Sequence, residues 1–325
     1  MPLAEGEWNL SYGAHGILPG ADFTFGSRRS GYDLLEPYEI TYADADLGDT
    51  PMPRTDALRL GQDFKAAATI TFEIGVDTVG ASKTQLGRHG ANLDALSSAA
   101  QAWDAEAIRR RFGVPAVLRT VQGGRQRRFY GRPRKWAPAA SRLTRQGHTS
   151  VVASFACVDA LSYDDTEQSK IVRLQPPDHR GLVGPLKDPV TMTGESASVL
   201  PGGITVGGTK PTWPVITIYG PISQPQCVLV DRALDDRDPG KGSLPGWTIG
   251  LDLGIGDGET ITIDTRPWAR TVLRNGEASV AGYLSWGSPR MEDMRLPTGR
   301  QDMTLRGVDD TGSARMVVAW RDAYA

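Results

Sequence analysis

The stretch Thr69-Ile-Thr-Phe-Glu-Ile-Gly-Val76 decides how the first part of this chain folds. Apolar residues occupy every second position, which places them on one face of an extended segment: Ile70, Phe72, Ile74 and Val76. Strict alternation of this kind predicts a strand with one buried face. The segment Leu58-Arg-Leu60 lies just before it, and we expect that segment to be its hairpin partner.

Composition agrees with a β-rich protein of more than one domain. The chain has 325 residues, which suggests about two domains of ordinary size. Its 38 glycines and 22 prolines favour many short strands joined by turns. Since 36 Lys and Arg nearly balance 38 Asp and Glu, the chain is neither a globally basic nucleic-acid binder nor an acidic disordered segment.

One helix is expected, over about residues 92–111. Asn92 is a suitable N-cap, and Gly113 and Pro115 follow the last turn. Apolar residues recur between them at helical spacing: Leu93, Leu96, Ala100, Trp103 and Ala107. After it, Gly123-Gly124 predicts a tight hairpin, so residues 1–163 are interpreted as a β-sandwich with one helix.

The rest of the chain divides into a connector and a second β domain. Residues 164–200 are rich in proline and polar residues and predict a linker or extended arm. From residue 201 to 325 short alternating segments recur, and Asn275-Gly276 is a strong hairpin signal. We therefore expect a mainly β chain of two β-sandwich domains, the second of jelly-roll or galectin-like type.

Catalytic and metal-binding patterns are missing from the sequence. It contains no GxSxG, HExxH or Walker motif, and no pair of carboxylates stands out for glycoside hydrolysis. The four histidines have no ligand at metal spacing, and the acidic cluster from Asp231 to Asp238 has basic residues within it. We expect no enzymatic activity, no cofactor and no metal.

Charge is distributed unevenly along the chain. Residues 107–158 contain no Asp or Glu and twelve Lys or Arg, so the other residues hold 24 cations and 38 anions. Such a division favours contact between copies or with an acidic partner. The candidate interface residues are Arg119, Arg125, Arg127, Arg128, Arg132, Arg134 and Lys135. A solvated Arg-rich hairpin is the plain alternative, and Phe129, Tyr130 and Trp136 among the cations leave nucleic-acid contact open.

The order of these parts resembles the distal tail proteins, or minor tail proteins, of siphovirus-type phages. In the first half the resemblance is carried by Leu58–Lys65 running into Ile70–Ile74, by the helix around Trp103 and by the Arg-rich hairpin. In the second half it is carried by Ile261–Asp264, Val272–Gly276 and Met294–Gly299. The first domain is similar to the family's belt domain, which is related to the tail-tube fold, and the second to its galectin-like domain. The Pro-rich segment 164–200 departs from the simplest members of the family.

The resemblance implies a structural protein of the virion. Such proteins form a hexameric ring at the distal end of the tail and join the tail tube to the hub, baseplate or receptor-binding proteins. The tail tube, tape-measure, hub and fibre proteins are then its partners, and DNA is met only in passage through the lumen.

Two other functions stay open at this point. The second domain could be a host-surface carbohydrate-binding module that uses Trp268 and Trp286, or the chain could be a cell-wall hydrolase. The first residues lack a basic n-region, and no run of 18 apolar residues occurs. We therefore expect synthesis in the host cytoplasm and no membrane insertion.

Overall fold

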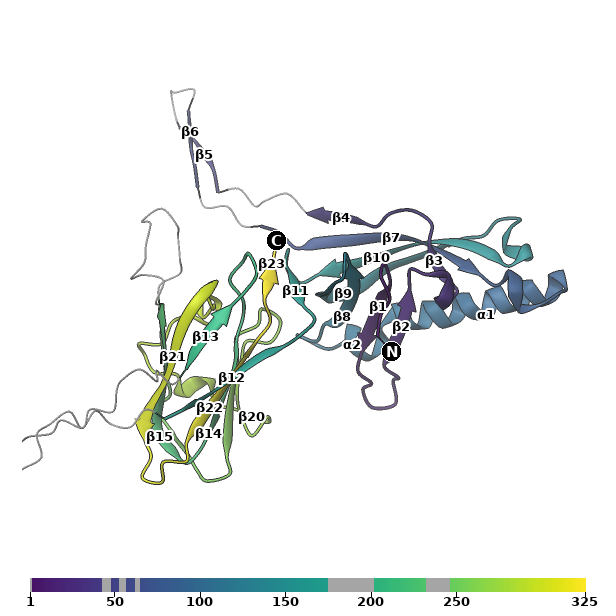
Figure 1. Ribbon diagram of the computed structural model, residues 1–325. Helices are drawn as coiled ribbons and strands as arrows, with labels where there is room; N and C mark the ends of the chain where they lie inside the picture. The colour runs from purple at the N-terminus through teal and green to yellow at the C-terminus, as the bar shows by residue number, and fades with distance from the viewer. Residues whose placement is uncertain (1, 43–47, 53–56, 62–64, 175–201, 232–245) are drawn as a thin grey trace, which may run out of the picture. The chain divides into compact units, whose positions relative to one another are not determined.

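The computed structural model describes residues 2–42, 48–52, 57–61, 65–174, 202–231 and 246–325. The chain divides into two compact units: residues 1–165 together with Ala325, and Thr166–Tyr324. Both are built mainly from antiparallel strands (Figure 1), so the prediction of a mainly β chain with two β-sandwich-like units is confirmed. Among the described residues, no helix combines the length and apolar character that a membrane crossing needs.

The first unit is an antiparallel sheet covered by one long helix (Figure 1). Its strands are β1 Trp8–Tyr12, β2 Ala21–Phe25, β3 Tyr32–Leu34, β4 Glu39–Tyr42, β5 Thr50–Pro51, β6 Leu58–Arg59, β7 Ala68–Asp77, β8 Ala116–Gln122, β9 Arg125–Ala139, β10 His148–Cys157 and β11 Ser162–Asp164. The sheet runs β2-β1-β8-β9-β10-β7-β3, with β4 on β7 and β11 on β9. Short 3-10 turns occupy Arg28–Ser30, Val79–Ala81 and Thr144–Gln146.

Strand β7 confirms the alternation read from the sequence. Its apolar residues from Ile70 to Val76 are all at most 1% exposed. The expected hairpin partner is wrong, however, because Leu58–Arg59 pairs with Thr50–Pro51 and not with β7. Strand β10 pairs with β7 from His148 to Ala156, and this long register gives far more backbone hydrogen bonding than a two-residue strand could.

The helix begins seven residues earlier than the sequence pattern indicates. Helix α1 spans Gln85–Asp104, and Ala105, with φ 50°, separates it from the short α2, Glu106–Arg109. The N-cap is Thr84, whose Oγ1 accepts a hydrogen bond from the Gly87 amide at 3.2 Å. Asn92 instead lies fully buried inside the helix, where its side chain bonds to neighbouring strands.

Aromatic residues form the core between α1 and the sheet. Phe72 on β7 packs edge-to-face on Trp8 and Phe25, and Trp103 of α1 contacts both Phe25 and Phe72. Edge-to-face contacts at these centroid separations of 4.9 to 6.4 Å are favourable beyond the area that they bury. Trp103 therefore has the core position that its spacing predicted, whereas Leu93 is 48% exposed.

The second unit is a sandwich of two antiparallel sheets. Its strands are β12 Gln168–Arg173, β13 Gly203–Val206, β14 Val215–Tyr219, β15 Ile222–Asp231, β16 Thr248–Gly250, β17 Gly254–Ile255, β18 Thr260–Asp264, β19 Thr271–Arg274, β20 Ala278–Ser279, β21 Gly299–Val308, β22 Arg315–Trp320 and β23 Ala323–Tyr324. One sheet runs β12-β22-β14-β18-β19-β20, and the other runs β13-β21-β15-β16 with β17 on β15. Their inner faces share one buried apolar cluster. Short 3-10 turns lie at Ala281–Tyr283 and Met291–Asp293.

The segment expected to be a linker contributes a strand to the second sandwich. Residues Gln168–Arg173 form β12, which pairs with β22 along its full length. Residues 175–200 of that segment lie outside the described residues. Both hairpin signals are confirmed: Gly123 and Gly124 join β8 to β9 at φ 58° and 71°, and Asn275-Gly276 lies between β19 and β20.

Candidate subunit interface

The β8–β9 hairpin holds the predicted interface residues, and it places two of its cations directly opposite each other. Arg119 on β8 pairs in register with Arg128 on β9. Like charges in such positions repel unless each has its own partner. The Arg119 Nη2 donates to Asn9 Oδ1 at 2.7 Å, and the Arg128 Nη2 donates to Asp165 Oδ1 at 2.6 Å. The pair is therefore stabilised from both sides within the first unit.

Two carboxylates that follow the basic segment neutralise part of it. Asp164 and Asp165 lie at the end of β11, which pairs with β9. Arg127 Nη1 and Asp164 Oδ2 are 3.2 Å apart, and the Arg127 and Arg128 side chains are only 15% and 16% exposed. Although the charges are separated along the sequence, part of the positive charge of the hairpin is neutralised by these two carboxylates in the folded unit.

Arg132 has an internal role of another kind. Its Nε and Nη2 donate to the Val114 carbonyl at 3.0 and 2.9 Å, and its other bonds go to the carbonyls of Arg109 and Arg111. Burial, followed by the charge of Arg134, lowers the pKa of the Arg132 guanidinium. This side chain therefore ties the loop after α2 to strand β9.

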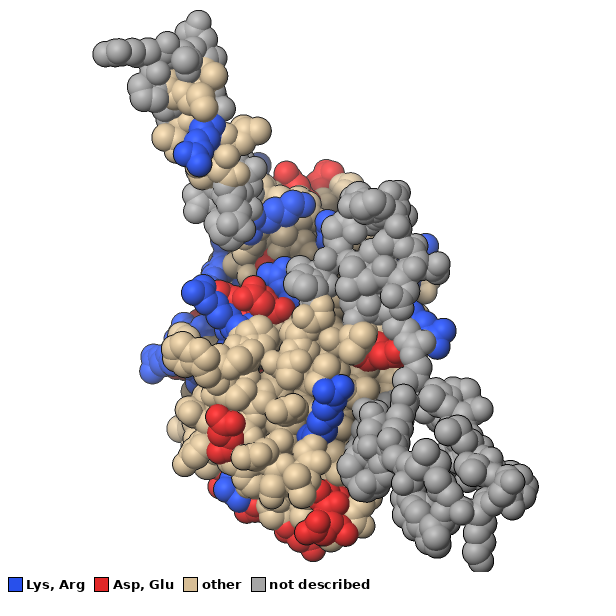
Figure 2. Space-filling view, turned by 90° about the vertical axis from the view of Figure 1, so that its left-hand side faces the viewer, with Lys and Arg blue, Asp and Glu red and all other residues tan. Residues whose placement is uncertain are grey.

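Three of the predicted interface residues project into solvent. Arg125, Arg134 and Lys135 are exposed on β9, and within the described part of the chain their side chains have no ion-pair partner. Figure 2 shows that basic and acidic side chains lie next to one another on the face that it presents, with uncharged residues over much of the rest. A contact made by the hairpin would therefore use these three residues first.

The aromatic residues of the hairpin do not form a stacking surface for nucleic-acid bases. Phe129 and Tyr130 are buried, and Trp136 packs on Trp103 with ring centroids 5.6 Å apart. Base stacking needs an open aromatic face, so this arrangement speaks against a nucleic-acid strip.

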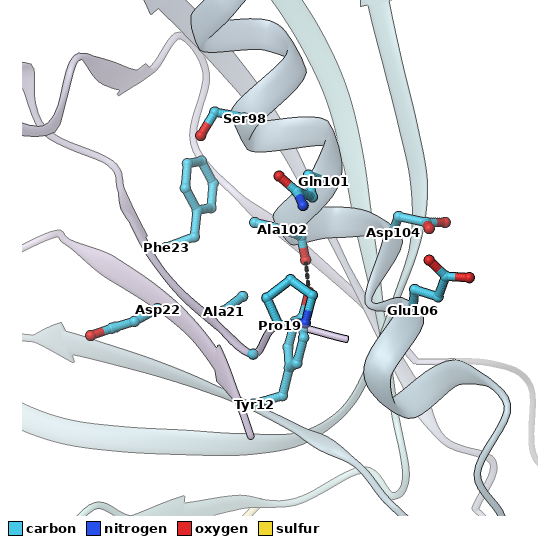
Figure 3. Close-up of a pocket in the computed structure, with 11 residues that line it drawn as sticks. Tyr12, Pro19, Ala21, Asp22, Phe23, Ser98, Gln101, Ala102, Asp104 and Glu106 are labelled. Atoms are coloured by element: carbon cyan, nitrogen blue, oxygen red, sulfur yellow. Dashed lines mark hydrogen bonds between the residues drawn. The ribbon is translucent and has the colours of Figure 1, made fainter. Parts of the chain in front are cut away.

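A pocket of about 290 Å³ opens at the end of α1, where the β1–β2 loop meets the helix (Figure 3). We call it the Tyr12 pocket; its lining residues are Tyr12, Pro19, Gly20, Ala21, Asp22, Phe23, Ser98, Gln101, Ala102, Asp104 and Glu106. The Tyr12 hydroxyl donates to the Ala102 carbonyl at 2.7 Å. Burial, and then the nearby charge of Asp104, raises the pKa of Tyr12. The periodicity of the sequence does not reveal this pocket. The pocket is formed by a loop and by the last turns of a helix, which are far apart in the chain.

The two tryptophans considered for sugar binding differ in accessibility. Trp268 is half-buried, and the Arg266 guanidinium lies 5.5 Å from its ring centroid. Trp286 is fully exposed, in a turn whose Ser285 and Ser288 hydrogen bond with the backbone of Gly250. Trp286 thus presents an open indole ring, and one face of Trp268 is covered.

The structure gives little sign of metal or thiol chemistry in the described residues. They contain no group of three or more His, Cys, Asp or Glu side chains placed to hold a metal ion. Most of the acidic cluster from Asp231 to Asp238 lies outside the described residues. Burial raises the pKa values of Cys157 and Cys227 to about 12, which disfavours the reactive thiolate form of both.

Comparisons with known proteins identify the fold. No family model matches the sequence, and no curated protein matches it. The SPP1 Dit protein, described as a paradigm of the hub adsorption apparatus in phages that infect Gram-positive bacteria, matches with a TM-score of 0.51 at 12% identity. The match covers 98% of this chain and 99% of that chain. Two structures of the phage p2 baseplate in its activated conformation, with Sr and with Ca, match at 10% identity with TM-scores of 0.47 and 0.46.

The likeness to SPP1 Dit extends over both units. This chain therefore has the fold of a phage distal tail protein, and the resemblance inferred from the sequence is confirmed at the level of the fold.

Proposed function

We propose that this protein is a structural component of the tail tip of a siphovirus-type phage. Copies would assemble, as hexamers, into a ring that joins the tail tube to the hub, baseplate or receptor-binding proteins. The observation that carries the proposal is the match to SPP1 Dit, which covers 98% of this chain and 99% of that chain and therefore extends over both units.

The candidate interface supports a role in binding rather than in catalysis. A closed ring requires head-to-tail contacts, in which one surface of a copy meets a different surface of the next. The exposed Arg125, Arg134 and Lys135 offer one such surface, whereas Arg119, Arg127, Arg128 and Arg132 stabilise the unit that presents it.

The proposed partners are the tail tube, tape-measure, hub and fibre proteins, with DNA met only in passage through the lumen. The protein would therefore be found at the distal end of the tail in the virion. Antibody labelling of intact virions in electron micrographs tests this location, and label along the tail shaft or on the head would contradict it.

The mass of the purified full chain tests assembly. We expect light scattering after size exclusion to give about six times the chain mass of 35.0 kDa, and micrographs to show a ring with a central hole. A monomer at every concentration up to the solubility limit would refute the proposal.

A second candidate function rests on Trp286. An exposed indole in the second unit could stack on a sugar ring of the host surface, as aromatic side chains do at binding sites. Binding of the full chain to a glycan array that is lost in Trp286→Ala and kept in Trp268→Ala would support it. If the full chain binds none of the bacterial wall sugars on the array, this second function is refuted. No observation favours the cell-wall hydrolase hypothesis.

A further inference from the structure

The loop between β9 and β10, residues 141–147, presents one apolar side chain between two cations. We call it the Leu143 loop. Leu143 is 51% exposed, and Arg142 and Arg145 on either side of it are exposed as well. Neither arginine has an ion-pair or hydrogen-bond partner for its side chain in the described part of the chain. An apolar residue held in water between unpaired cations is a surface suited to a partner.

A buried polar network holds this loop in a single conformation. The Thr144 Oγ1 accepts a hydrogen bond from the Ser141 amide at 3.0 Å and lies 3.1 Å from the Thr149 hydroxyl. Thr149 in turn donates to Asn92 Oδ1 on α1 at 2.7 Å. Gly147 completes the turn at φ 96°, a conformation that other residues rarely adopt. Because the loop is already ordered, it loses little conformational entropy when a partner binds to it.

The Tyr12 pocket at the other end of α1 has the complementary chemistry. Its walls include the side chains of Tyr12, Pro19 and Phe23, which are apolar over most of their surface (Figure 3). Asp104 and Glu106 border one side of it and Asp22 borders the other (Figure 3). A hollow that is partly apolar and has carboxylates at its rim suits an apolar side chain between guanidinium groups.

We propose that the Leu143 loop of one copy inserts into the Tyr12 pocket of the next copy. Leu143 would fill the apolar part of the pocket, and Arg142 and Arg145 would pair with the carboxylates at its rim. This inference rests on the proposed ring and names the two surfaces that meet in it.

A second copy is the occupant because the loop cannot reach the pocket of its own chain. The loop is fixed beside Asn92, and Ala102 of the pocket lies ten residues further along α1, about 15 Å away at the helical rise. Two different surfaces at opposite ends of one helix make a head-to-tail contact, which closes into a ring when the rotation between copies permits.

Existing ion pairs at the rim do not block this contact. Arg109 pairs with Asp104, and Arg110 lies 3.6 Å from Glu106, but both carboxylate side chains are more than 40% exposed. Exposed pairs of this kind contribute little free energy and rearrange readily. On the other side of the pocket, the Asp22 carboxylate accepts a hydrogen bond from only the Asn9 side-chain amide in the described structure.

Two full-chain variants separate the two surfaces. The loop variant carries Arg142→Ala, Leu143→Ala and Arg145→Ala, and the pocket variant carries Ser98→Arg and Gln101→Arg, which replace two exposed lining residues. The matched control carries Lys170→Ala, Ile171→Ala and Arg173→Ala, because these exposed residues of β12 repeat the same residue classes and spacing in the second unit. Circular dichroism establishes that each variant is folded before its mass is measured.

We expect the control to assemble as the wild type does, and each of the two variants alone to remain a monomer. When they are mixed, the intact loop of the pocket variant meets the intact pocket of the loop variant. The mixture should therefore form a species of twice the chain mass of 35.0 kDa and nothing larger.

The possible failures are distinguishable. A wild-type ring together with normal assembly of either variant would overturn the pairing of loop and pocket and leave the ring intact. If both variants fail to assemble and their mixture forms no dimer, the pairing of loop and pocket is overturned as well. A wild-type chain that never assembles would refute the proposed function itself.

Discussion

The Thr149 hydroxyl donates a hydrogen bond of 2.7 Å to Asn92 Oδ1, and both side chains are at most 1% exposed. The Asn92 amide also donates to the Val76 carbonyl at 3.2 Å. One asparagine in the first half of α1 thus joins the helix to strands β7 and β10. Buried polar groups are costly without partners, so this side chain is specified by its contacts and not by helix propensity.

Asn92→Ala should destabilise the first unit by about 1–3 kcal/mol, because it leaves a buried hydroxyl and a buried carbonyl without these bonds. Urea unfolding should show a lower midpoint with an unchanged slope. Ser97→Ala is the matched control, since Ser97 is exposed on the same helix. Equal midpoints for the two variants would show that the network contributes nothing.

Arg127→Glu combined with Arg128→Glu should unfold or strongly destabilise the first unit. Each substitution places a carboxylate beside Asp164 or Asp165, in a position where the native side chain is at least 84% covered. Breaking such partly buried pairs costs about 3–5 kcal/mol. The exposed pair Arg134→Glu and Lys135→Glu should leave the melting temperature nearly unchanged. Thermal unfolding by circular dichroism compares the two, and similar melting temperatures would contradict the assignment.

This contrast shows where sequence reasoning succeeded and where it could not. Alternation in 69–76 and the Gly123-Gly124 turn are local signals, and both elements were predicted correctly. The partner of Arg128 lies 37 residues away and is brought beside it only by the pairing of β11 with β9. The sequence alone therefore does not distinguish the seven candidate cations from one another. In the folded unit, four of them are partly buried and bonded to internal partners.

Two further features were beyond local patterns for similar reasons. Thr84 and Asn92 are both able to cap a helix, and only the neighbouring strands decide that Asn92 is buried instead. The Tyr12 pocket requires the β1–β2 loop to lie against the end of α1, about eighty residues later in the chain. Neither the helix start nor the pocket follows from periodicity.

Both cysteines should be inert while the protein is folded. With pKa values of about 12, Cys157 and Cys227 have roughly one thiolate per ten thousand thiols at pH 8, and both side chains are buried. A thiol reagent such as dithionitrobenzoate should therefore label neither in native protein and both in denaturant. Fast labelling of the native chain would show that one of the two β units opens readily.

The stability of the N-terminal region should depend on pH through Glu7. Its carboxylate accepts hydrogen bonds from the Ser27 hydroxyl at 2.6 Å and from the Ala4 amide at 2.8 Å. These bonds, that of Ser27 first, lower the pKa of Glu7 from its ordinary value of 4.5. Because the folded pKa is the lower one, the stabilisation is complete above pH 4.5 and is lost as the pH falls through the folded value.

Ser27→Ala removes the larger of these contributions, so its effect should itself depend on pH. The variant should be less stable than wild type at pH 7, and the difference should be smaller at pH 3, below the ordinary pKa of 4.5, because the variant lacks the larger cause of the lowered pKa of Glu7. Urea unfolding at the two pH values measures this. Ser30→Ala is a control from the same turn, because within the described residues the Ser30 hydroxyl bonds to the backbone of Ser27 and Tyr32. A Ser27→Ala effect of equal size at both pH values would mean that the hydroxyl stabilises the turn without reference to the charge of Glu7.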